Sequence, residues 1–276
     1  SNGFAGGYAR TSRSTSAVAF CGTGTGMERD WAGESRIYQS DMPSAESIGA
    51  LAAERALARL GASRPVTGSY PVLFDERVAQ TLIGHLLSAV NGASVARGSS
   101  WLRDALGQQV LPAGLSLVED PLRPRYPSSR PFDGEGISGK PLTMIEDGVL
   151  KHWFLSSSAA RELGLKTNGR GVRGGTSVSP SSTNLALEPG DISPEELIRS
   201  VGTGLYITDM IGQGVDMITG EYSRGASGFL IRGGQIAGPI AEFTIAGNLI
   251  DMFAAPRGAL PEIVDFQPKA GVLPWL

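Results

Sequence analysis

The sequence predicts an α+β protein, built mainly of antiparallel β-sheet, open or barrel-like, with three or four helices packed on it. Its 38 glycines and 17 prolines make up about a fifth of the 276 residues, where about 12% is usual. This content indicates many turns and excludes long helical bundles and coiled coils. Amphipathic stretches also alternate with short apolar runs bounded by turn residues, which is typical of helices mixed with a meandering sheet.

Helices are predicted where apolar residues recur at helical spacing behind a capping residue. In the segment 43–60, Ser44 can cap the N-terminus and Glu46 lies in the first turn, where the helix dipole favours negative charge. A second amphipathic segment covers 76–90. A third helix starts at Ser193-Pro-Glu-Glu196, where a capping box is expected. Shorter helices are predicted at 157–163 and 247–253.

Strands are predicted in the apolar runs between these helices. The Asp147-Gly148 pair is the strongest turn signal, because both residues tolerate the positive φ angles of a type I′ hairpin. The expected strands cover 14–20, 70–74, 115–118, 142–145, 149–155 and several runs within 205–245, including a hairpin at 229–237. The stretches 121–131 and 166–182 are rich in Pro, Gly, Ser or Arg, and we expect both to be loops.

Charge and composition exclude several classes of protein. With 24 Lys and Arg against 27 Asp and Glu, the chain has no general attraction for nucleic acid or anionic lipid. No apolar run is long enough to span a membrane. Cys21 is the single cysteine, so an intrachain disulfide and a multi-cysteine zinc site are both excluded. A lone cysteine also fits a reducing compartment.

The residues that could carry chemistry form no recognisable catalytic pattern. His85 and His152 have no partner at metal-ligand spacing, so we expect structural roles for both. Asp133 and Glu135 lie in a Gly-rich stretch and are interpreted as solvated acids of a turn, with acid–base catalysis as the alternative. The glycine run 22–26 lacks the spacing of a dinucleotide-binding loop. Five arginines are interpreted as a solvated surface: Arg123, Arg125, Arg130, Arg170 and Arg173.

Eight motifs follow one another along most of the chain. They are Gly26-Met-Glu-Arg-Asp30, Gly84-His-Leu-Leu87 with Asn91-Gly92, Arg130-Pro-Phe-Asp-Gly-Glu-Gly136, Ser158-Ala-Ala-Arg161 with Leu163-Gly-Leu-Lys166, Asn184-Leu-Ala-Leu-Glu-Pro-Gly190, Gly212-Gln-Gly214, Thr219-Gly-Glu-Tyr-Ser-Arg-Gly-Ala-Ser-Gly-Phe229 and Glu242-Phe-Thr-Ile-Ala-Gly-Asn248. Together they resemble the TldD/PmbA family, in particular its PmbA (TldE) branch. The resemblance covers residues 1–253 and matches the later part of family members, without their N-terminal α/β domain.

The resemblance implies a bacterial, cytoplasmic metalloprotease of two related subunits that processes unfolded or modified peptides and takes part in peptide maturation. The TldD-type subunit carries His-Glu-x-x-x-His and a late Cys, which hold zinc. The PmbA-type subunit lacks them and forms a heterodimer with the catalytic one, or a homodimer when alone. In an ungapped alignment the three motif positions fall on Gly84, His85 and Ala89, which cannot hold the metal. We therefore assign no catalytic, cofactor-binding or metal-ligating residue to this chain, and expect zinc in its partner.

Two segments are candidates for the subunit interface or the peptide channel, namely 219–229 and the 166–182 loop. A peptide could also bind as a strand added to an open sheet edge. The segment 254–276 departs from the family pattern and reads as a divergent, Pro-rich tail. Two other functions stay open: a non-enzymatic modulator of another protein, and a metal-independent hydrolase that uses Cys21 or a serine.

Overall fold

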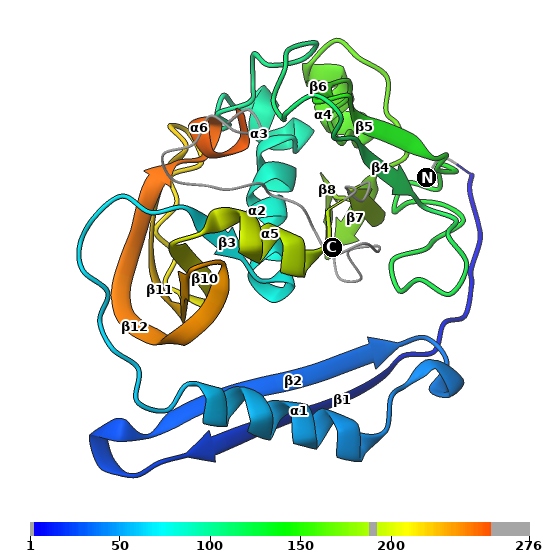
Figure 1. The fold of residues 1–276 in the computed structure, drawn as a ribbon. Coiled ribbons are helices and arrows are strands. Elements are labelled where there is room, and N and C mark those ends of the chain that lie inside the picture. Colours follow the sequence, from blue (N-terminus) through cyan, green and yellow to red (C-terminus); the bar gives the residue numbers. More distant parts are fainter. Residues whose placement is uncertain (1–2, 188–191, 255–276) are drawn as a thin grey trace.

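The computed structural model describes residues 3–187 and 192–254, and it has the predicted α+β class (Figure 1). The first unit, drawn in blue, is a hairpin of β1 (Arg13–Cys21) and β2 (Glu28–Arg36), covered on one face by α1 (Ala45–Ala58). Short 3₁₀ turns at Gly24–Gly26 and Gln39–Asp41 connect these elements. The predicted cap is confirmed, because the Ser44 side chain accepts a hydrogen bond from the Ser47 N–H at 3.1 Å.

A curved four-stranded sheet has the order β12-β11-β10-β3. Its long antiparallel strands are β10 (Gly204–Ile211), β11 (Glu221–Arg232) and β12 (Gln235–Asn248). The short β3 (Val72–Phe74) pairs in parallel with β10 at the opposite edge from β12. The sheet is therefore mainly antiparallel, and β12 forms one of its edges.

A second four-stranded sheet has the order β6-β5-β4-β9 and is antiparallel throughout. Its strands are β4 (Leu117–Asp120), β5 (Leu142–Glu146), β6 (Val149–Leu150) and β9 (Asn184–Leu187). The β5–β6 turn confirms the predicted hairpin, with φ of 49° at Asp147 and 77° at Gly148. The segment 166–182 was predicted to be a loop, which is wrong in part: β7 (Gly171–Gly174) and β8 (Ser177–Pro180) form a hairpin there.

Six α-helices occur in the described residues, where three or four were expected to pack on the sheet, and of the six only the short α3 has no counterpart among the predicted helical segments. Beside α1 they are α2 (Glu76–Ala89), α3 (Gly92–Ala96), α4 (Ser157–Glu162), α5 (Pro194–Val201) and α6 (Leu249–Ala254). The Ser193–Glu196 capping box at α5 is present as predicted. Most of the tail 254–276 lies outside the described residues.

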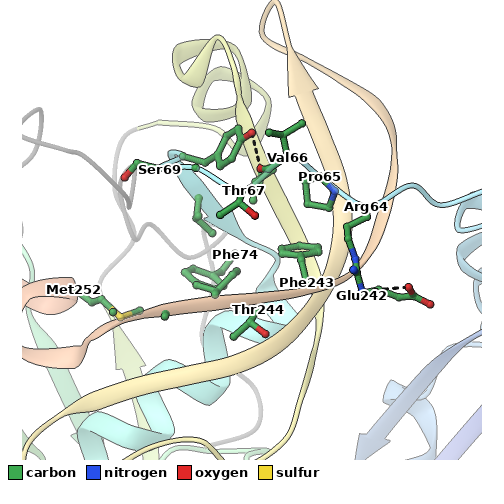
Figure 2. Close-up of a pocket in the computed structure, with 17 residues that line it drawn as sticks. Arg64, Pro65, Val66, Thr67, Ser69, Phe74, Glu242, Phe243, Thr244 and Met252 are labelled. Carbon is green, nitrogen blue, oxygen red and sulfur yellow. Dashed lines mark hydrogen bonds and ion pairs between the residues drawn. The ribbon is translucent and has the colours of Figure 1, made fainter.

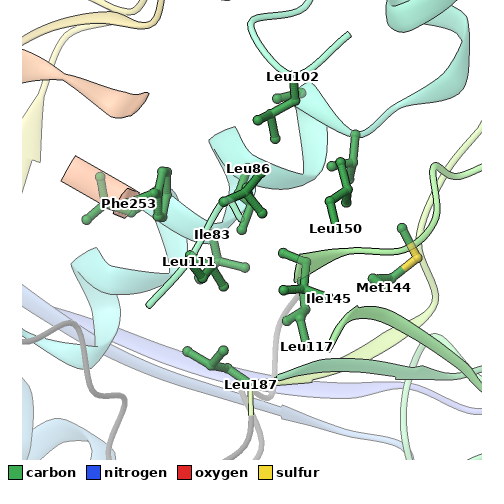
Figure 3. Close-up of a cluster of buried hydrophobic side chains, with 14 of the residues drawn as sticks. Ile83, Leu86, Leu102, Leu111, Leu117, Met144, Ile145, Leu150, Leu187 and Phe253 are labelled. Carbon is green, nitrogen blue, oxygen red and sulfur yellow. The ribbon is translucent and has the colours of Figure 1, made fainter. Parts of the chain in front are cut away.

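The main hydrophobic core lies around α2 (Figure 3). Ile83 and Leu86 of this helix pack with residues of the second sheet and of α6, all nearly inaccessible to solvent. The residues from the other elements include Leu117, Met144, Ile145, Leu150, Leu187 and Phe253. Each such side chain contributes about 1.5–3 kcal/mol on burial. The helix α2 is thus the shared element that joins the two sheets.

A single bridge connects the two edges of the curved sheet without closing it into a barrel. The Ser63 N–H donates to the Pro239 carbonyl, and the Ala241 N–H donates to the Ser63 carbonyl, each at 3.1 Å. The chain then continues from Ser63 to β3 at the other edge. Beyond this bridge, no strand of the described chain lies beside residues 242–247 on their side away from β11.

The hairpin unit is attached to the curved sheet and to α2 by ion pairs around Asp30. Arg77 at the start of α2 donates from Nη1 to Asp30 Oδ1 at 2.9 Å and pairs through Nε with Asp75 Oδ1 at 3.0 Å. Arg59, just after α1, lies 3.6 Å from Asp30 Oδ2 and donates to the Ser227 hydroxyl at 2.8 Å. The Asp30 side chain is 6% exposed, so water compensates little for a lost partner.

Replacing Asp30 by Asn is expected to lower the free energy of unfolding by about 2 kcal/mol, because a hydrogen-bonded carboxylate is lost between two arginines. Urea denaturation of the variant measures the change. Asp104→Asn is the matched control, since the Asp104 side chain is 85% exposed beside Arg103 and its loss should change stability little. Equal stability of D30N and the unchanged chain would mean that the ion pairs around Asp30 do not stabilise the attachment of the hairpin unit.

Candidate functional site

A groove of about 480 Å³ lies between the segment 64–70 and the free edge of β12 (Figure 2). Its floor comes from β3 and β10, and one wall comes from residues 242–247 of β12. The groove forms where the chain from Ser63 to β3 runs beside the edge of β12. The curved sheet is thus not a closed barrel, and the groove lies along its open edge.

The groove is apolar inside and charged at its rim. The apolar surface comes from Phe74, Phe243, Ile245 and Met252, all of which also pack against the neighbouring cores. At the rim, Arg64 Nη2 lies 3.6 Å from Glu242 Oε2, and both side chains are largely exposed. Such a surface suits a ligand with apolar side chains and a polar backbone.

Glu242 shapes the edge of the groove. Its φ of 56° is unusual for a residue with a side chain, and it lies where the β11–β12 register shifts between Ala226 and Gly228. A bulge of this kind bends a strand and redirects the residues beside it. Residues 243–247 therefore turn away from the Ser63 bridge, which leaves their outer edge accessible. The sequence contains no signal for this bulge, because glutamate is not a typical residue at positive φ.

A second, more open hollow of about 980 Å³ lies beside the β10–β11 connection. Residues 213–218, Glu221 and Ser223 line it, and Ala246 and Gly247 border both hollows. The candidate segment 219–229 is therefore mostly the strand β11, and only its first residues line a hollow. The other candidate, 166–182, contributes no residue to either hollow.

The helix positions that align with a zinc motif lie on α2. Ala89 is fully buried, whereas a Cβ atom on Gly84 would have no neighbour within 4 Å. His85 lies between them, half-buried, and both burial and the charge of Arg224 lower the pKa of its imidazole. Across the described ranges, no three His, Cys, Asp or Glu side chains are grouped closely enough to hold a metal ion. A thiol hydrogen bond ties Cys21 to the Ala56 carbonyl at 3.1 Å.

Two interpretations of charged residues are wrong. Asp133 is not a solvated acid: it is 4% exposed and accepts hydrogen bonds from the N–H groups of Glu135, Ile137 and Gly171. Arg170 is not a surface arginine: it is 1% exposed and pairs with the buried Glu119. Sequence reasoning missed both because Gly171 lies 38 residues from Asp133, and Glu119 lies 51 residues from Arg170. His152 is partly exposed, and burial lowers its pKa as well.

The arrangement defines an α+β protein with an apolar groove along an open sheet edge. The profile of the PmbA/TldA metallopeptidase C-terminal domain matches residues 67–269. The metalloprotease PmbA of Escherichia coli O157:H7 is 41% identical over 253 residues, which are 92% of this chain and 54% of that protein. A PmbA homologue of Haemophilus influenzae is 40% identical over 74% of this chain and 44% of its own length. The chain therefore belongs to the PmbA/TldD metallopeptidase family.

Solved structures have the same fold. A Bacteroides thetaiotaomicron protein, named as a candidate modulator of DNA gyrase, superposes with a TM-score of 0.83 at 29% identity over 92% of this chain and 56% of its own. TldE from Thermococcus kodakarensis superposes with a TM-score of 0.75 at 21% identity, over 85% and 54% of the two chains. The chain thus spans about half the length of the relatives it matches. None of its described helices is long and apolar enough to cross a membrane.

Proposed function

We propose that this chain is the PmbA-type subunit, without its own zinc site, of a two-subunit cytoplasmic metalloprotease that processes unfolded or modified peptides. Its role is to hold an extended peptide while a TldD-type partner supplies zinc and cleaves. The observation that carries the proposal is the apolar groove along the free edge of β12. Membership of the family supports the assignment to a protease complex.

An open strand edge suits a protease substrate of varied sequence. Main-chain N–H and C=O groups of the edge pair with any extended peptide, so affinity does not depend on particular side chains. The six residues 242–247 offer about 20 Å of edge at roughly 3.3 Å per residue. Every second side chain of the bound peptide would face the apolar surface of Phe243 and Ile245, which favours apolar residues at alternate positions.

The residues of α2 support a division of labour between two subunits. Gly84 and Ala89 carry no ligand atom, and His85 alone cannot complete a zinc site. A hydrolytic zinc needs three protein ligands and an open position for water. We therefore place the metal in the partner subunit and the binding of the peptide on this one.

Peptidase activity is expected only when this chain is mixed with a TldD-type subunit, and a chelator should abolish it. The measurement is cleavage of an unfolded protein by each chain alone and by the mixture.

Phe243→Ala should weaken peptide binding to this chain by about tenfold, because it removes an apolar wall of the groove. Ile236→Ala is the matched control, since Ile236 is exposed on the same strand outside the groove.

Three outcomes would contradict the proposal. Chelator-sensitive cleavage by this chain alone would mean that it holds its own metal site, and chelator-resistant cleavage would favour a hydrolase that uses Cys21 or a serine. Silence of the mixture, together with peptide binding that F243A leaves unchanged, would favour the second candidate, a non-enzymatic modulator. The name of the Bacteroides relative, a candidate modulator of DNA gyrase, is the observation that favours this alternative.

A further inference from the structure

Three polar atoms near the groove are buried without a hydrogen bond of good geometry to the described residues. They are Nε2 of His85, the hydroxyl of Tyr222 and Nε of Arg224, and the Tyr222 hydroxyl lies within reach of the Arg224 side chain. The whole Tyr222 residue is 2% exposed. Buried polar atoms are rarely left unpaired in folded proteins, because each costs about 1–3 kcal/mol of desolvation. Three of them in one place therefore indicate a ligand.

The three residues come from two elements that face each other. Tyr222 and Arg224 lie two residues apart on β11, so their side chains point to the same face of the sheet. His85 reaches them from α2, with its ring centroid 6.1 Å from that of Tyr222 and the planes at 74°. The charge of Arg224 acts on both other residues, since it lowers the pKa of His85 and opposes the rise in the pKa of Tyr222.

The cluster lies one strand behind the wall of the groove. The register of the sheet pairs Tyr222 with Gly247 and Arg224 with Ile245, and both partners line the groove. Cross-strand partners share a face of the sheet, so a ligand above Ile245 and Gly247 is next to Arg224 and Tyr222. Gly247 has no side chain that would separate the groove from Tyr222. Tyr222 also borders the second hollow.

The cluster has one positive charge and no acid of the described chain to balance it. No carboxylate of the described residues lies within 4.0 Å of the Arg224 guanidinium, whose Nη2 donates to the Met210 carbonyl at 3.5 Å. Burial raises the pKa of Tyr222 to about 12, so its hydroxyl keeps the proton that it can donate. Burial also keeps His85 neutral near pH 7, since its pKa is lowered. A single negative charge with oxygen acceptors would complete this set.

We propose that Arg224, Tyr222 and His85 form a carboxylate-binding site directly behind the β12 wall of the groove, and that it takes a carboxylate of the bound peptide. The inference rests on the proposed peptide groove and adds a preference for peptides with a negative charge. Arginine pairs with carboxylates through parallel N–H donors, and such pairs are strongest where water is excluded. The carboxylate has two sources, the C-terminus of the peptide and an Asp or Glu side chain within it.

The test is calorimetric titration of the 276-residue chain with three N-acetylated heptapeptides of Val and Ala. One ends in a free carboxylate, one ends in an amide, and one ends in an amide but contains a single Asp. At least one carboxylate peptide is expected to bind about tenfold more tightly than the neutral amide. A preference for the first peptide assigns the site to the chain terminus, and a preference for the third assigns it to a side chain.

Two variants connect this preference to the cluster. Arg224→Gln and Tyr222→Phe should each reduce the tenfold preference to about twofold or less, while the neutral amide keeps its affinity. Y222F removes only a hydroxyl, which interacts with the Arg224 side chain but makes no hydrogen bond of good geometry, so its thermal stability should change little. Arg232→Gln is the matched control, because Arg232 is exposed at the far end of the same strand and should keep the preference.

The outcomes distinguish this inference from the groove itself. If all three peptides bind with equal affinity, the carboxylate site is wrong and the peptide groove remains. A preference that persists in both R224Q and Y222F also overturns the site. If none of the peptides binds, the groove is wrong and the inference that rests on it is overturned too.

Discussion

Replacing Glu119 by Gln is expected to lower the free energy of unfolding by about 3–5 kcal/mol, since it leaves a buried arginine without its counter-charge. Glu119 and Arg170 are 0% and 1% exposed. Arg170 Nε donates to Glu119 Oε2 at 2.6 Å, and the Thr183 N–H donates to Oε1 at 2.6 Å. Arg170 also donates to the carbonyls of Asn168 and Lys140, which fixes the neighbouring chain to the second sheet.

Glu146→Gln provides the comparison for this variant. The Glu146 side chain is 65% exposed on the same sheet, 3.5 Å from Lys151 Nζ, and its loss should cost less than about 1 kcal/mol. Denaturant unfolding of both variants measures the difference. If E119Q and E146Q prove equally stable, the buried pair does not stabilise this sheet as described.

Gly228→Ala is expected to destabilise the curved sheet by about 3 kcal/mol or more, which is the upper range for overpacking in a core. A Cβ atom at this position would lie 2.0 Å from the Tyr206 carbonyl oxygen and 2.9 Å from Ile207 Cα. Both contacts are with the backbone of β10, which no side-chain rotation can relieve. The strands β10 and β11 would have to separate, so the floor of the groove would be displaced as well.

Gly225→Ala tests whether the space, rather than the loss of a glycine, causes the effect. Gly225 lies on the same strand, and its added Cβ would meet Ile211 atoms at an ordinary 3.6 Å. This variant should change stability by less than about 1 kcal/mol, because a β-strand tolerates alanine where space allows. Thermal unfolding of the two variants measures the contrast, and similar melting temperatures would refute the proposed clash.

The elements that could be predicted from the sequence are those with local signals. Ser44 and Ser193 cap the helices that follow them, and Asp147-Gly148 forms its hairpin turn, because each signal acts within a few residues. The strand β2 was not predicted, since its buried face holds only Asp30 and Ala32 and lacks an apolar alternation. The β7–β8 hairpin was missed because a contact that holds it is distant in sequence: the Gly171 N–H donates to Asp133, 38 residues earlier in the chain.

The kind of candidate site was predicted from the sequence, but its position and its residues were not. An open sheet edge was predicted as a candidate for peptide binding, but the position of the groove depends on Ser63 and Glu242, whose contacts are far apart in sequence. Likewise, His85 was noted as a histidine without a metal-ligand partner, and its position beside Tyr222 appears only once α2 is packed on β11. Such contacts depend on tertiary packing, which local sequence patterns do not predict.

The bridge at Ser63 has a mechanical consequence. Ser63 lies only four positions after Arg59, which holds the end of α1 against Asp30 and Ser227. On its other side, Ser63 is bonded to β12 at the rim of the groove. A force that tilts the hairpin unit is therefore transmitted to this rim over a span of about 14 Å at most, given the reach of an extended chain. A tilt of the hairpin unit is therefore expected to change the width of the groove.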